Sequence, residues 1–249
     1  MNALEVRNVC YDYPDGTRAL RGISFTLAEG ERLGLIGPNG AGKSTLLWHL
    51  NGLLPDPLTQ ASSVTVFDLP MLPSHLPLIR ARVGLLFQNP DDQLFCPTVA
   101  DDVAFGPQQL GLSSTEIDAR VKTSLSQVAL PGFEPRHPHR LSHGEKHRVA
   151  LAGLLAADAR LLLLDEPSAG LDPRGRRELQ SLLRSLPQAQ IIATHDLELV
   201  VALCQRVLLL NQGQVVACGP TRDLLNDEPL MLANGLERPH CLRHPHPHD

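Results

Sequence analysis

The segment Gly37-Pro38-Asn39-Gly40-Ala41-Gly42-Lys43-Ser44 matches the pattern GxxxxGK[ST]. An apolar run typical of a buried strand precedes it at residues 32–36, and a helical pattern follows it at residues 43–53. Glycines allow consecutive backbone N–H groups to point inward at phosphate oxygens, and the N-terminus of the following helix adds partial positive charge. The segment therefore predicts a phosphate-binding loop between a strand and a helix. The alternative is a glycine-rich turn with an incidental lysine.

Three side chains at the end of this loop have separate expected roles. Lys43 is expected to reach the β- and γ-phosphates of a bound nucleotide, Ser44 to coordinate Mg²⁺, and Thr45 to contact phosphate from the first helical turn. The remaining cradle around the phosphates is expected to consist of Gly37, Pro38, Asn39, Gly40, Ala41 and Gly42.

A second apolar run, at residues 161–164, ends in Asp165 and Glu166. A buried strand that ends in two carboxylates places them at the carboxyl edge of a sheet, where open α/β sheets bind ligands. We expect Asp165 to hold Mg²⁺ and Glu166 to orient and polarise an attacking water, because phosphoryl transfer needs a positioned nucleophile. The alternative is a strand end with two ordinary polar residues.

The sequence Ser142-His143-Gly144-Glu145 precedes a helical pattern and has the form of a capping box. Ser142 is expected to cap the helix, and Glu145 is expected to reach back to Ser142. The simpler interpretation is a well-capped helix and nothing more. A cap does not require Gly144, however, and the missing side chain there would let a phosphate approach the backbone.

Composition excludes several classes of protein. The chain has 249 residues and a formal net charge of −5, so it lacks the positive excess typical of nucleic-acid-binding surfaces. Its apolar runs are too short to span a bilayer, and residues 1–10 do not have the pattern of a signal peptide. The 5 cysteines are odd in number and lack CxxC spacing, which favours reduced thiols in a cytoplasmic compartment.

Strand and helix patterns alternate along the chain and predict an α/β fold with a mostly parallel sheet core. An alternating strand is expected at residues 3–10, another strand at 23–27, and a mainly helical insert at about 97–157. Further strands are expected at 161–164, 191–193 and 207–210, and helices are expected between them at 173–186 and 197–203. One domain is expected over residues 1–236, and residues 237–249 are expected to form a disordered tail rich in His and Pro.

The order of the motifs over residues 3–225 resembles that of the ATP-binding-cassette ATPases. The resemblance rests on the phosphate loop, Gln88 after a strand, the capping box, Asp165-Glu166, Ser168-Ala169-Gly170-Leu171-Asp172 and His195. It implies a P-loop NTPase fold of that type, with an N-terminal antiparallel β part and an inserted helical subdomain. The implied cofactors are ATP and Mg²⁺.

The resemblance also assigns residues. Gln88 is implied to be a catalytic residue that also contacts Mg²⁺, and His195 to be the catalytic switch histidine. Tyr13 matches the aromatic residue that stacks on adenine, although a tyrosine at a strand end would look the same in the sequence. In a head-to-tail pair of cassettes, Ser142 and Gly144 would close over the ATP of the opposing subunit.

Two positions depart from the family's signature, which commonly has Gly at position 143 and Gln at position 145. This chain has His143 and Glu145 instead. A carboxylate near a phosphate is electrostatically unfavourable, and we expect Lys146 and Arg148 to offset it, with a contribution from protonated His143 or His147.

The stretch that follows Gln88 is similar to the ATPase subunits of energy-coupling-factor importers, especially the cobalt and nickel group. It reads Asn89-Pro90-Asp91-Asp92-Gln93-Leu94-Phe95. The alternative for Asp91-Asp92 is a solvated loop. The similarity implies a peripheral protein on the cytoplasmic face of the cell membrane. Its partners would be a second cassette ATPase, in a homo- or heterodimer, together with a transmembrane scaffold and substrate-binding membrane subunits, and no nucleic acid.

Other functions remain open from the sequence. A vitamin importer of the energy-coupling-factor type would use the same cassette, since other subunits bind the substrate. A cassette ATPase that clamps DNA or ribosomes agrees less well with the net charge of −5. A regulator that binds nucleotide without hydrolysis agrees less well with the presence of Glu166 and His195.

The C-terminal tail is rich in residues that suit Ni²⁺, Co²⁺ or Zn²⁺, namely His240, Cys241, His244, His246 and His248. The alternative is a plain solvated tail.

Overall fold

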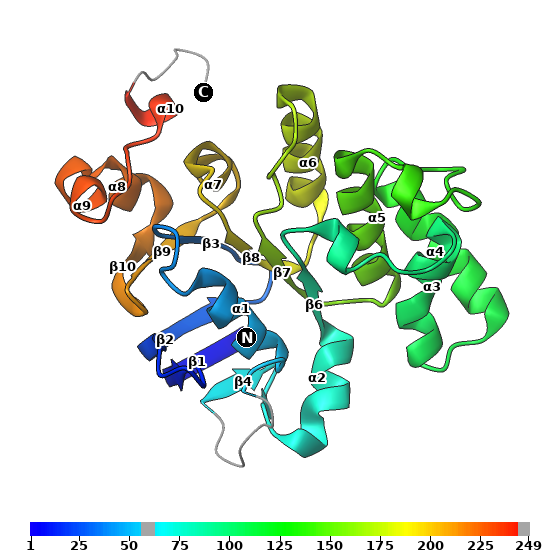
Figure 1. Ribbon diagram of the computed structural model, residues 1–249, viewed down its shortest axis with the longest axis horizontal. Coiled ribbons are helices and arrows are strands. Elements are labelled where there is room, and N and C mark those ends of the chain that lie inside the picture. Colours follow the sequence, from blue (N-terminus) through cyan, green and yellow to red (C-terminus); the bar gives the residue numbers. More distant parts are fainter. Residues whose placement is uncertain (56–62, 244–249) are drawn as a thin grey trace. The chain divides into compact units, whose positions relative to one another are not determined.

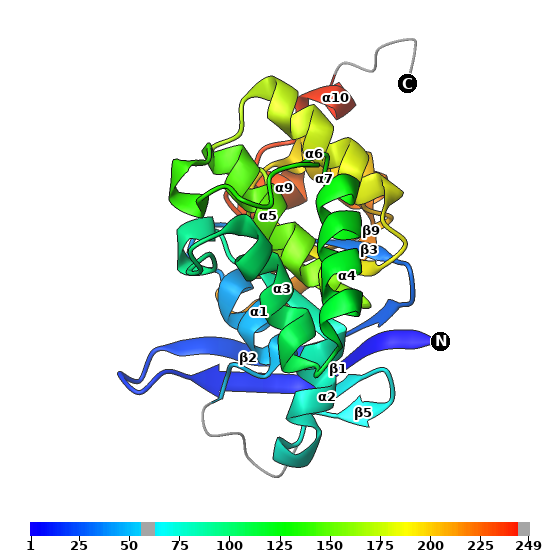
Figure 2. The ribbon, with the colours of Figure 1, turned by 90° about the vertical axis from the view of Figure 1, so that its right-hand side faces the viewer.

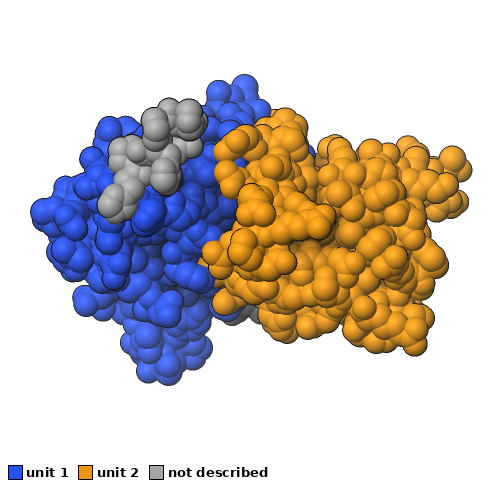
Figure 3. Space-filling model, turned by 90° about the horizontal axis from the view of Figure 1, so that it is seen from above, with its two compact units in different colours: residues 1–80, 188–249 blue, residues 81–187 orange. Residues whose placement is uncertain are grey.

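The computed structural model describes residues 1–55 and 63–243. Its chain forms two compact units, one made of Met1–Arg80 with Gln188–Asp249 and the other of Ala81–Pro187, drawn in two colours in Figure 3. The sequence does not predict a division at these positions. Within the described ranges, no helix combines the length and hydropathy needed to cross a membrane. All five cysteines lie within these ranges and are free thiols.

An antiparallel sheet occupies the N-terminal part of the first unit, as expected. Its strands are β1 (Asn2–Asp12), β2 (Arg18–Ala28), β4 (Val64–Val66) and β5 (Leu69–Pro70), in the order β2-β1-β4-β5. Figure 1 labels β1, β2 and β4, and Figure 2 labels β5. The turn between β1 and β2 is closed by hydrogen bonds from Tyr13 N to Thr17 O and from Gly16 N to Tyr13 O. The predicted strands at 3–10 and 23–27 are therefore confirmed, and both extend further than the sequence indicated.

The first unit also contains a mostly parallel set of strands. Strand β3 (Arg32–Ile36) pairs in parallel with β8 (Ala189–Ala193) on one side and β9 (Arg206–Asn211) on the other, while β10 (Gln214–Pro220) pairs antiparallel with β9. Strands β3 and β8 are almost entirely buried, which explains their continuous apolar sequences. Each fully buried Leu or Ile there contributes about 1.5–3 kcal/mol relative to an exposed one.

The helices of the first unit begin with α1 (Lys43–Asn51), which directly follows the glycine-rich loop. The others are α7 (Leu197–Leu203), α8 (Thr221–Asn226), α9 (Glu228–Ala233) and α10 (His240–Arg243). Helix α7 packs closely on β3, because a Cβ atom at Gly34 would lie 2.6 Å from Val200 Cγ1. A side chain at position 34 would therefore push α7 away from the strand.

The second unit contains a pair of parallel strands and four longer helices. Strand β6 (Val83–Leu86) pairs with β7 (Leu161–Asp165), with Leu86 opposite Leu164. Helices α3 (Val99–Gln109), α4 (Ser114–Gln127) and α5 (His143–Ala156) lie against one another, as Figures 1 and 2 show, and α6 (Pro173–Ser185) follows β7. Gly106 permits the approach of α3 to α5, since a Cβ atom there would lie 2.9 Å from Ala157 Cβ.

Several elements were absent from the sequence prediction. Helix α2 (Leu76–Arg82) contains a proline and follows the proline-containing turn at Pro73–His75. Strand β10 and helices α8 and α9 were also missed.

The prediction of a disordered tail from residue 237 onward is wrong for its first part. Residues His240–Arg243 form the short helix α10, in which Leu242 N and Arg243 N donate to Pro239 O. Cys241 N donates to Glu198 Oε1 of α7 at 3.2 Å, so this segment is attached to the first unit. The predicted metal-binding histidines at positions 244, 246 and 248 lie outside the described residues.

Candidate nucleotide-binding site

The glycine-rich loop connects the end of β3 to the start of α1, as predicted. Gly37 has φ 151°, and a Cβ atom there would lie 1.9 Å from the carbonyl oxygen of Leu210. Gly42 has φ 101° and is the N-cap of α1. It has no side chain that could accept hydrogen bonds from the first N–H groups of the helix. Glycine is thus required at both positions, and no N-cap side chain accepts a hydrogen bond from the first N–H groups of α1, which is the arrangement that favours an anion at a helix N-terminus.

Lys43 lies inside this loop. Its side chain is 8% exposed, and Nζ donates to the carbonyl oxygens of Gly37 at 2.8 Å and Pro38 at 3.2 Å. A buried ammonium group held by backbone carbonyls, next to the start of a helix, fits the phosphates of a nucleotide, because charge-assisted hydrogen bonds strengthen in a desolvated setting. The half-buried Ser44 hydroxyl follows it and is a hard oxygen donor of the kind that Mg²⁺ prefers.

Tyr13 reaches the start of the same helix. Its hydroxyl is 2.9 Å from Thr45 Oγ1, and its ring lies edge-on to Tyr11 with the centroids 5.0 Å apart. Tyr11 in turn contacts His49, whose Nδ1 donates to Thr45 O at 2.8 Å. The structure therefore brings the predicted adenine-stacking residue next to the phosphate loop, across 32 positions of sequence. It also gives the Thr45 hydroxyl a protein partner that the sequence did not indicate.

His195 lies at the same edge of the sheet as the phosphate loop. Strands β3 and β8 run parallel with Leu35 opposite Ala193, and Thr194 N donates to Leu35 O at 3.2 Å. The His195 side chain is exposed. Asp196 follows it and caps α7 by accepting a hydrogen bond from Leu199 N at 3.1 Å. His195 thus sits between a buried strand end and a capped helix start, both of which fix its backbone.

The other predicted catalytic residues belong to the second unit. Gln88 follows β6, and Asp165 and Glu166 follow the paired positions of β7, so the parallel register places all three at one edge of that strand pair. Asp165 is 5% exposed and Glu166 is 7% exposed, whereas Gln88 is exposed. Buried carboxylates at a strand end are suited to holding a cation or a polarised water.

Glu166 has an unusual backbone conformation. Its φ of 48° lies in the left-handed region, which costs a residue other than glycine about 1 kcal/mol or more. Ala169 N donates to Glu166 O at 3.0 Å and closes the turn that follows. Such strain concentrates at functional sites, so this observation favours a chemical role for Glu166 over an ordinary strand end.

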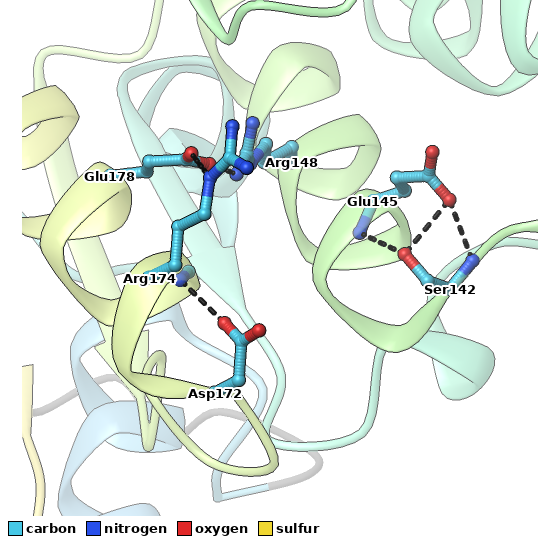
Figure 4. Close-up of polar contacts among 7 residues, drawn as sticks. Ser142, Glu145, Arg148, Asp172, Arg174 and Glu178 are labelled. Carbon is cyan, nitrogen blue, oxygen red and sulfur yellow. Dashed lines mark hydrogen bonds and ion pairs between the residues drawn. The ribbon is translucent and has the colours of Figure 1, made fainter.

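The predicted capping box at the start of α5 is confirmed (Figure 4). Glu145 Oε2 accepts from both Ser142 N and Ser142 Oγ at 2.8 Å, and Glu145 N donates to Ser142 Oγ at 3.3 Å. The Ser142 N–H group lowers the pKa of Glu145 below its ordinary value, and the Ser142 hydroxyl acts in the same direction. The Glu145 carboxylate is thus held ionised at the N-terminus of the helix, where its charge is favourable.

The expected compensation of Glu145 by Lys146 is wrong. Lys146 Nζ pairs with Asp91 Oδ1 at 2.5 Å, and Arg148 pairs with Glu178, while Arg148 and Arg136 make only small contributions to the lowered pKa of Glu145. The capping interaction with Ser142 dominates because it is direct. These charges are neighbours in the sequence, but their partners lie far along the chain and have no local sequence signal.

Gly144 and Gly170 lie close to side chains of the opposite segment. A Cβ atom at Gly144 would lie 3.1 Å from Leu171 Cδ2, and one at Gly170, where φ is 69°, would lie 2.9 Å from His143 Cδ2. The segment 168–172 therefore packs on the first turn of α5. The structure thus joins two of the motifs that carried the resemblance to the cassette ATPases.

His143 and His147 form a pair on one face of α5. Their Nε2 atoms are 3.1 Å apart, and their rings meet edge-on. Burial, followed by the neighbouring His143, lowers the pKa of His147 from 6.5 to about 4. His147 is therefore neutral at pH 7, and the expected charge compensation by a protonated His147 is wrong.

Acidification is expected to destabilise the protein through His147. Between pH 6.5 and about 4 the unfolded chain binds a proton at this residue and the folded chain does not, so the free energy of unfolding falls as the pH falls. The cost between pH 7 and pH 5 is about 2 kcal/mol. Urea unfolding at both pH values should show a smaller difference for His147→Phe than for wild type or for the exposed control His139→Phe. An equal pH dependence in all three proteins would contradict this assignment.

Two residues that order the loop after Gln88 were not assigned a role from the sequence. Gln93 Oε1 accepts from Phe87 N at 3.2 Å, and Gln93 Nε2 donates to Leu85 O at 3.2 Å, which fixes the end of β6. Asp102 Oδ1 accepts from Phe95 N and Cys96 N at 3.0 Å. The only sequence signal was the polar run 89–93, which does not reveal its partners.

The phosphate loop, Tyr13 and His195 thus lie in the first unit, and Gln88, Ser142, Gly144, Asp165 and Glu166 lie in the second. Across the described residues, no group of three or more His, Cys, Asp or Glu side chains is arranged to hold a metal ion.

Comparisons with known proteins agree with this geometry. Residues 20–169 match the family model described as "ABC transporter". The energy-coupling factor transporter ATP-binding protein EcfA of Methanococcus maripaludis is 45% identical to the chain, over 96% of the chain and 87% of that protein. Four further curated relatives, 48–52% identical over 95% of the chain, have only the general name of putative ABC transporter ATP-binding protein.

Two solved structures are also similar. One is CbiO1 from Clostridium perfringens, described as part of the ABC transporter complex CbiONQ, with a TM-score of 0.80, 35% identity, and coverage of 93% of this chain and 94% of that one. The other is the dimeric ATP-binding cassette MJ0796 in a post-hydrolysis state bound to ADP and phosphate, with a TM-score of 0.76, 25% identity, and coverage of 88% and 98%. The chain therefore belongs to the ABC transporter family, as an ATP-binding subunit of the P-loop NTPase fold whose ATP hydrolysis is coupled to transport.

Proposed function

We propose that this subunit powers a membrane importer of the energy-coupling-factor type that takes up a small nutrient, cobalt or nickel ion. The observation that carries the proposal is the similarity to EcfA over nearly the whole chain. The likeness to CbiO1 supports the same class of transporter. A vitamin importer of this type is the alternative, because the cassette does not bind the transported substrate.

The phosphate loop is proposed to bind ATP. Backbone N–H groups of the loop and Lys43 Nζ would hold the phosphates, and the Tyr13 ring would stack on adenine. Mg²⁺ would be held by the hydroxyl of Ser44, the amide oxygen of Gln88 and the carboxylate of Asp165, all hard oxygen donors. When bound, Mg²⁺ supplies charge neutralisation at the γ-phosphate.

Glu166 is proposed to be the residue that positions the attacking water. Its buried carboxylate and strained backbone favour a fixed orientation, which is what phosphoryl transfer needs from a protein. His195 and Gln88 would contribute hydrogen bonds at the reacting phosphate. In this proposal each group acts by positioning and by electrostatics, without a covalent intermediate.

Two copies of the cassette, or this cassette and a related one, are proposed to form a head-to-tail dimer. Ser142 and the backbone at Gly144 would then contact the γ-phosphate held by the loop of the opposing subunit. The N-terminus of α5 supports this role, because its partial positive charge favours an anion. The Ser142 hydroxyl would exchange its bond to Glu145 for a bond to phosphate.

ATP binding would favour the closed dimer, and loss of the γ-phosphate would release it. The dimer is proposed to act on the cytoplasmic face of the cell membrane, docked on a transmembrane scaffold that works with substrate-binding membrane subunits. The −5 net charge supports a function without nucleic acid.

Co-purification from membranes tests the transport assignment. The subunit should be recovered with integral membrane proteins, and the same cells should take up radioactive Co²⁺ or Ni²⁺ in a manner that requires Lys43. Vitamin uptake with the same requirement, and no metal uptake, would replace the proposed substrate. Recovery with DNA or ribosomes and without membrane proteins would contradict the importer.

A further inference from the structure

A cavity of about 660 Å³, open to solvent, lies in the second unit, and none of its lining residues is among those assigned to ATP. Helices α4, α5 and α6 contribute its lining, together with Val128 and Ala129 after α4. Its volume falls within the range of about 300–1,000 Å³ that is usual for small-molecule sites. The cavity is therefore large enough for a compact organic ligand.

Three arginines line this cavity, and only one carboxylate does. Arg148 of α5 and Arg174 of α6 both pair with Glu178, as Figure 4 shows. The distance between Arg174 Nε and Glu178 Oε1 is 2.8 Å. Hydrogen bonds from Arg174 and Arg148 hold the pKa of Glu178 below its ordinary value, so Glu178 is ionised. Three guanidinium groups and one carboxylate leave the lining with a net charge of about +2 at neutral pH.

Most of the donor capacity of these arginines is unused. Each guanidinium group has five N–H donors, and Arg148 and Arg174 each give one hydrogen bond to Glu178. Arg177, one turn along α6, forms no hydrogen bond or ion pair with any residue of the described part of the chain, and its side chain is exposed. Gln127 and Ser181 add uncharged polar groups to the same lining.

We infer that this cavity binds the phosphate group of a small, water-soluble organic phosphate. Arginine forks match phosphate oxygens in geometry and charge, and a dianionic phosphate would balance the positive excess. Val128, Ala129 and Leu182 provide apolar surface for the organic part of the ligand. All residues that line the cavity belong to the second unit, and the phosphate loop belongs to the first.

The position of the cavity gives its occupant a route to the ATPase. Its ligand would contact α5, which starts at the Ser142 capping box, and α6, which starts at the cap formed by Asp172 Oδ1 and Gly175 N at 2.7 Å (Figure 4). A phosphate held between Arg148 and the two arginines of α6 would tie these helices together. The site is therefore suited to regulation.

Calorimetric titration with inorganic pyrophosphate tests the inference. The full chain is used with Lys43→Ala, which weakens phosphate binding at the loop. Arg177→Gln should weaken pyrophosphate binding about tenfold, because it removes a charge-assisted contact. Arg176→Gln removes the same charge from the same helix outside the cavity lining and should change affinity less than about twofold. Equal affinity for the Arg177 and Arg176 variants, or no saturable binding at all, would overturn the inference.

Glu178→Gln provides a change in the opposite direction. It frees two guanidinium groups and raises the net charge of the lining by one, so pyrophosphate should bind several-fold more tightly. Weaker binding by this variant would overturn the inference, provided its circular dichroism matches that of the parent.

A lipid headgroup is the other possible source of a phosphate group. Co-sedimentation with vesicles of phosphatidylglycerol, against vesicles of phosphatidylcholine, separates the two sources. The inference predicts the same sedimentation for the parent and for Arg177→Gln. A loss of vesicle binding specific to Arg177→Gln would overturn the assignment to a soluble ligand.

Discussion

Replacement of Glu166 by Gln is expected to reduce ATP turnover by a factor of about 10² to 10⁴ while leaving ATP binding intact. Gln has nearly the same shape and can adopt the same left-handed backbone conformation, but it lacks the charge needed to polarise a water. The γ-phosphate would then persist, and the protein should accumulate as an ATP-loaded dimer. Phosphate release and size-exclusion chromatography with ATP and Mg²⁺ measure the two effects.

Glu228→Gln is the matched control, because this glutamate is exposed in the first turn of α9. It should retain wild-type turnover and show no trapped dimer. Normal turnover by Glu166→Gln would remove Glu166 from its proposed role, and a slow variant that stays monomeric with ATP would contradict the proposed closure.

Replacement of Lys43 by Ala is expected to weaken nucleotide binding by a factor of about 100 or more, because it removes a desolvated positive charge from the phosphate cradle. Lys43 is 8% exposed and donates to two carbonyls of its own loop, so the loss also loosens the loop. Titration with a fluorescent ATP analogue measures the affinity.

Lys122→Ala is the control for this change, since Lys122 is exposed on α4. Its nucleotide affinity should equal that of the wild type. An unchanged affinity for Lys43→Ala would contradict the assignment of the loop as the phosphate site. A thermal melt of both variants separates lost binding from lost folding.

The sequence predicted best where a local pattern determines the structure. Strand β3, the loop at residues 37–42 and the start of α1 follow from the glycines and the apolar run, and the observed strand has the predicted bounds. The capping box at Ser142 and Glu145 is equally local, because its two hydrogen-bonding residues are three positions apart. In both places the residues that form the sequence pattern are also the residues that make the structural contacts.

The sequence predicted least where partners are distant. The pairing of Lys146 with Asp91 spans 55 positions, and the contact of Tyr13 with Thr45 spans 32, so neither follows from local spacing. Helix α3 lies within the helical insert expected at about 97–157, but its bounds were not predicted because Gly106 and Pro107 weaken its intrinsic propensity. Close packing of Gly106 on Ala157, at the end of α5, compensates. The strained backbone of Glu166 also has no sequence signature.

Mixing two inactive variants tests the head-to-tail site most directly. Lys43→Ala disables the loop, and Gly144→Asp places a carboxylate where the phosphate would approach. An acidic residue suits the first turn of α5, and its Cβ, 3.1 Å from Leu171 Cδ2, requires only a small shift of that flexible side chain. Each variant alone should be nearly inactive. If every site combines one chain's loop with the other chain's Ser142 and Gly144, mixed dimers contain one intact site. An equal mixture should then regain up to about a quarter of wild-type ATPase activity, as random pairing of two-site dimers gives.

A mixture of wild type with Lys43→Ala is the control. Its wild-type homodimers alone give about a quarter of wild-type activity, so activity near a half shows that a dimer with one intact site turns over. With that result, recovery of ATPase activity in the mixture of the two inactive variants is the predicted result. Activity no greater than the sum of the two separate variants would contradict the shared site.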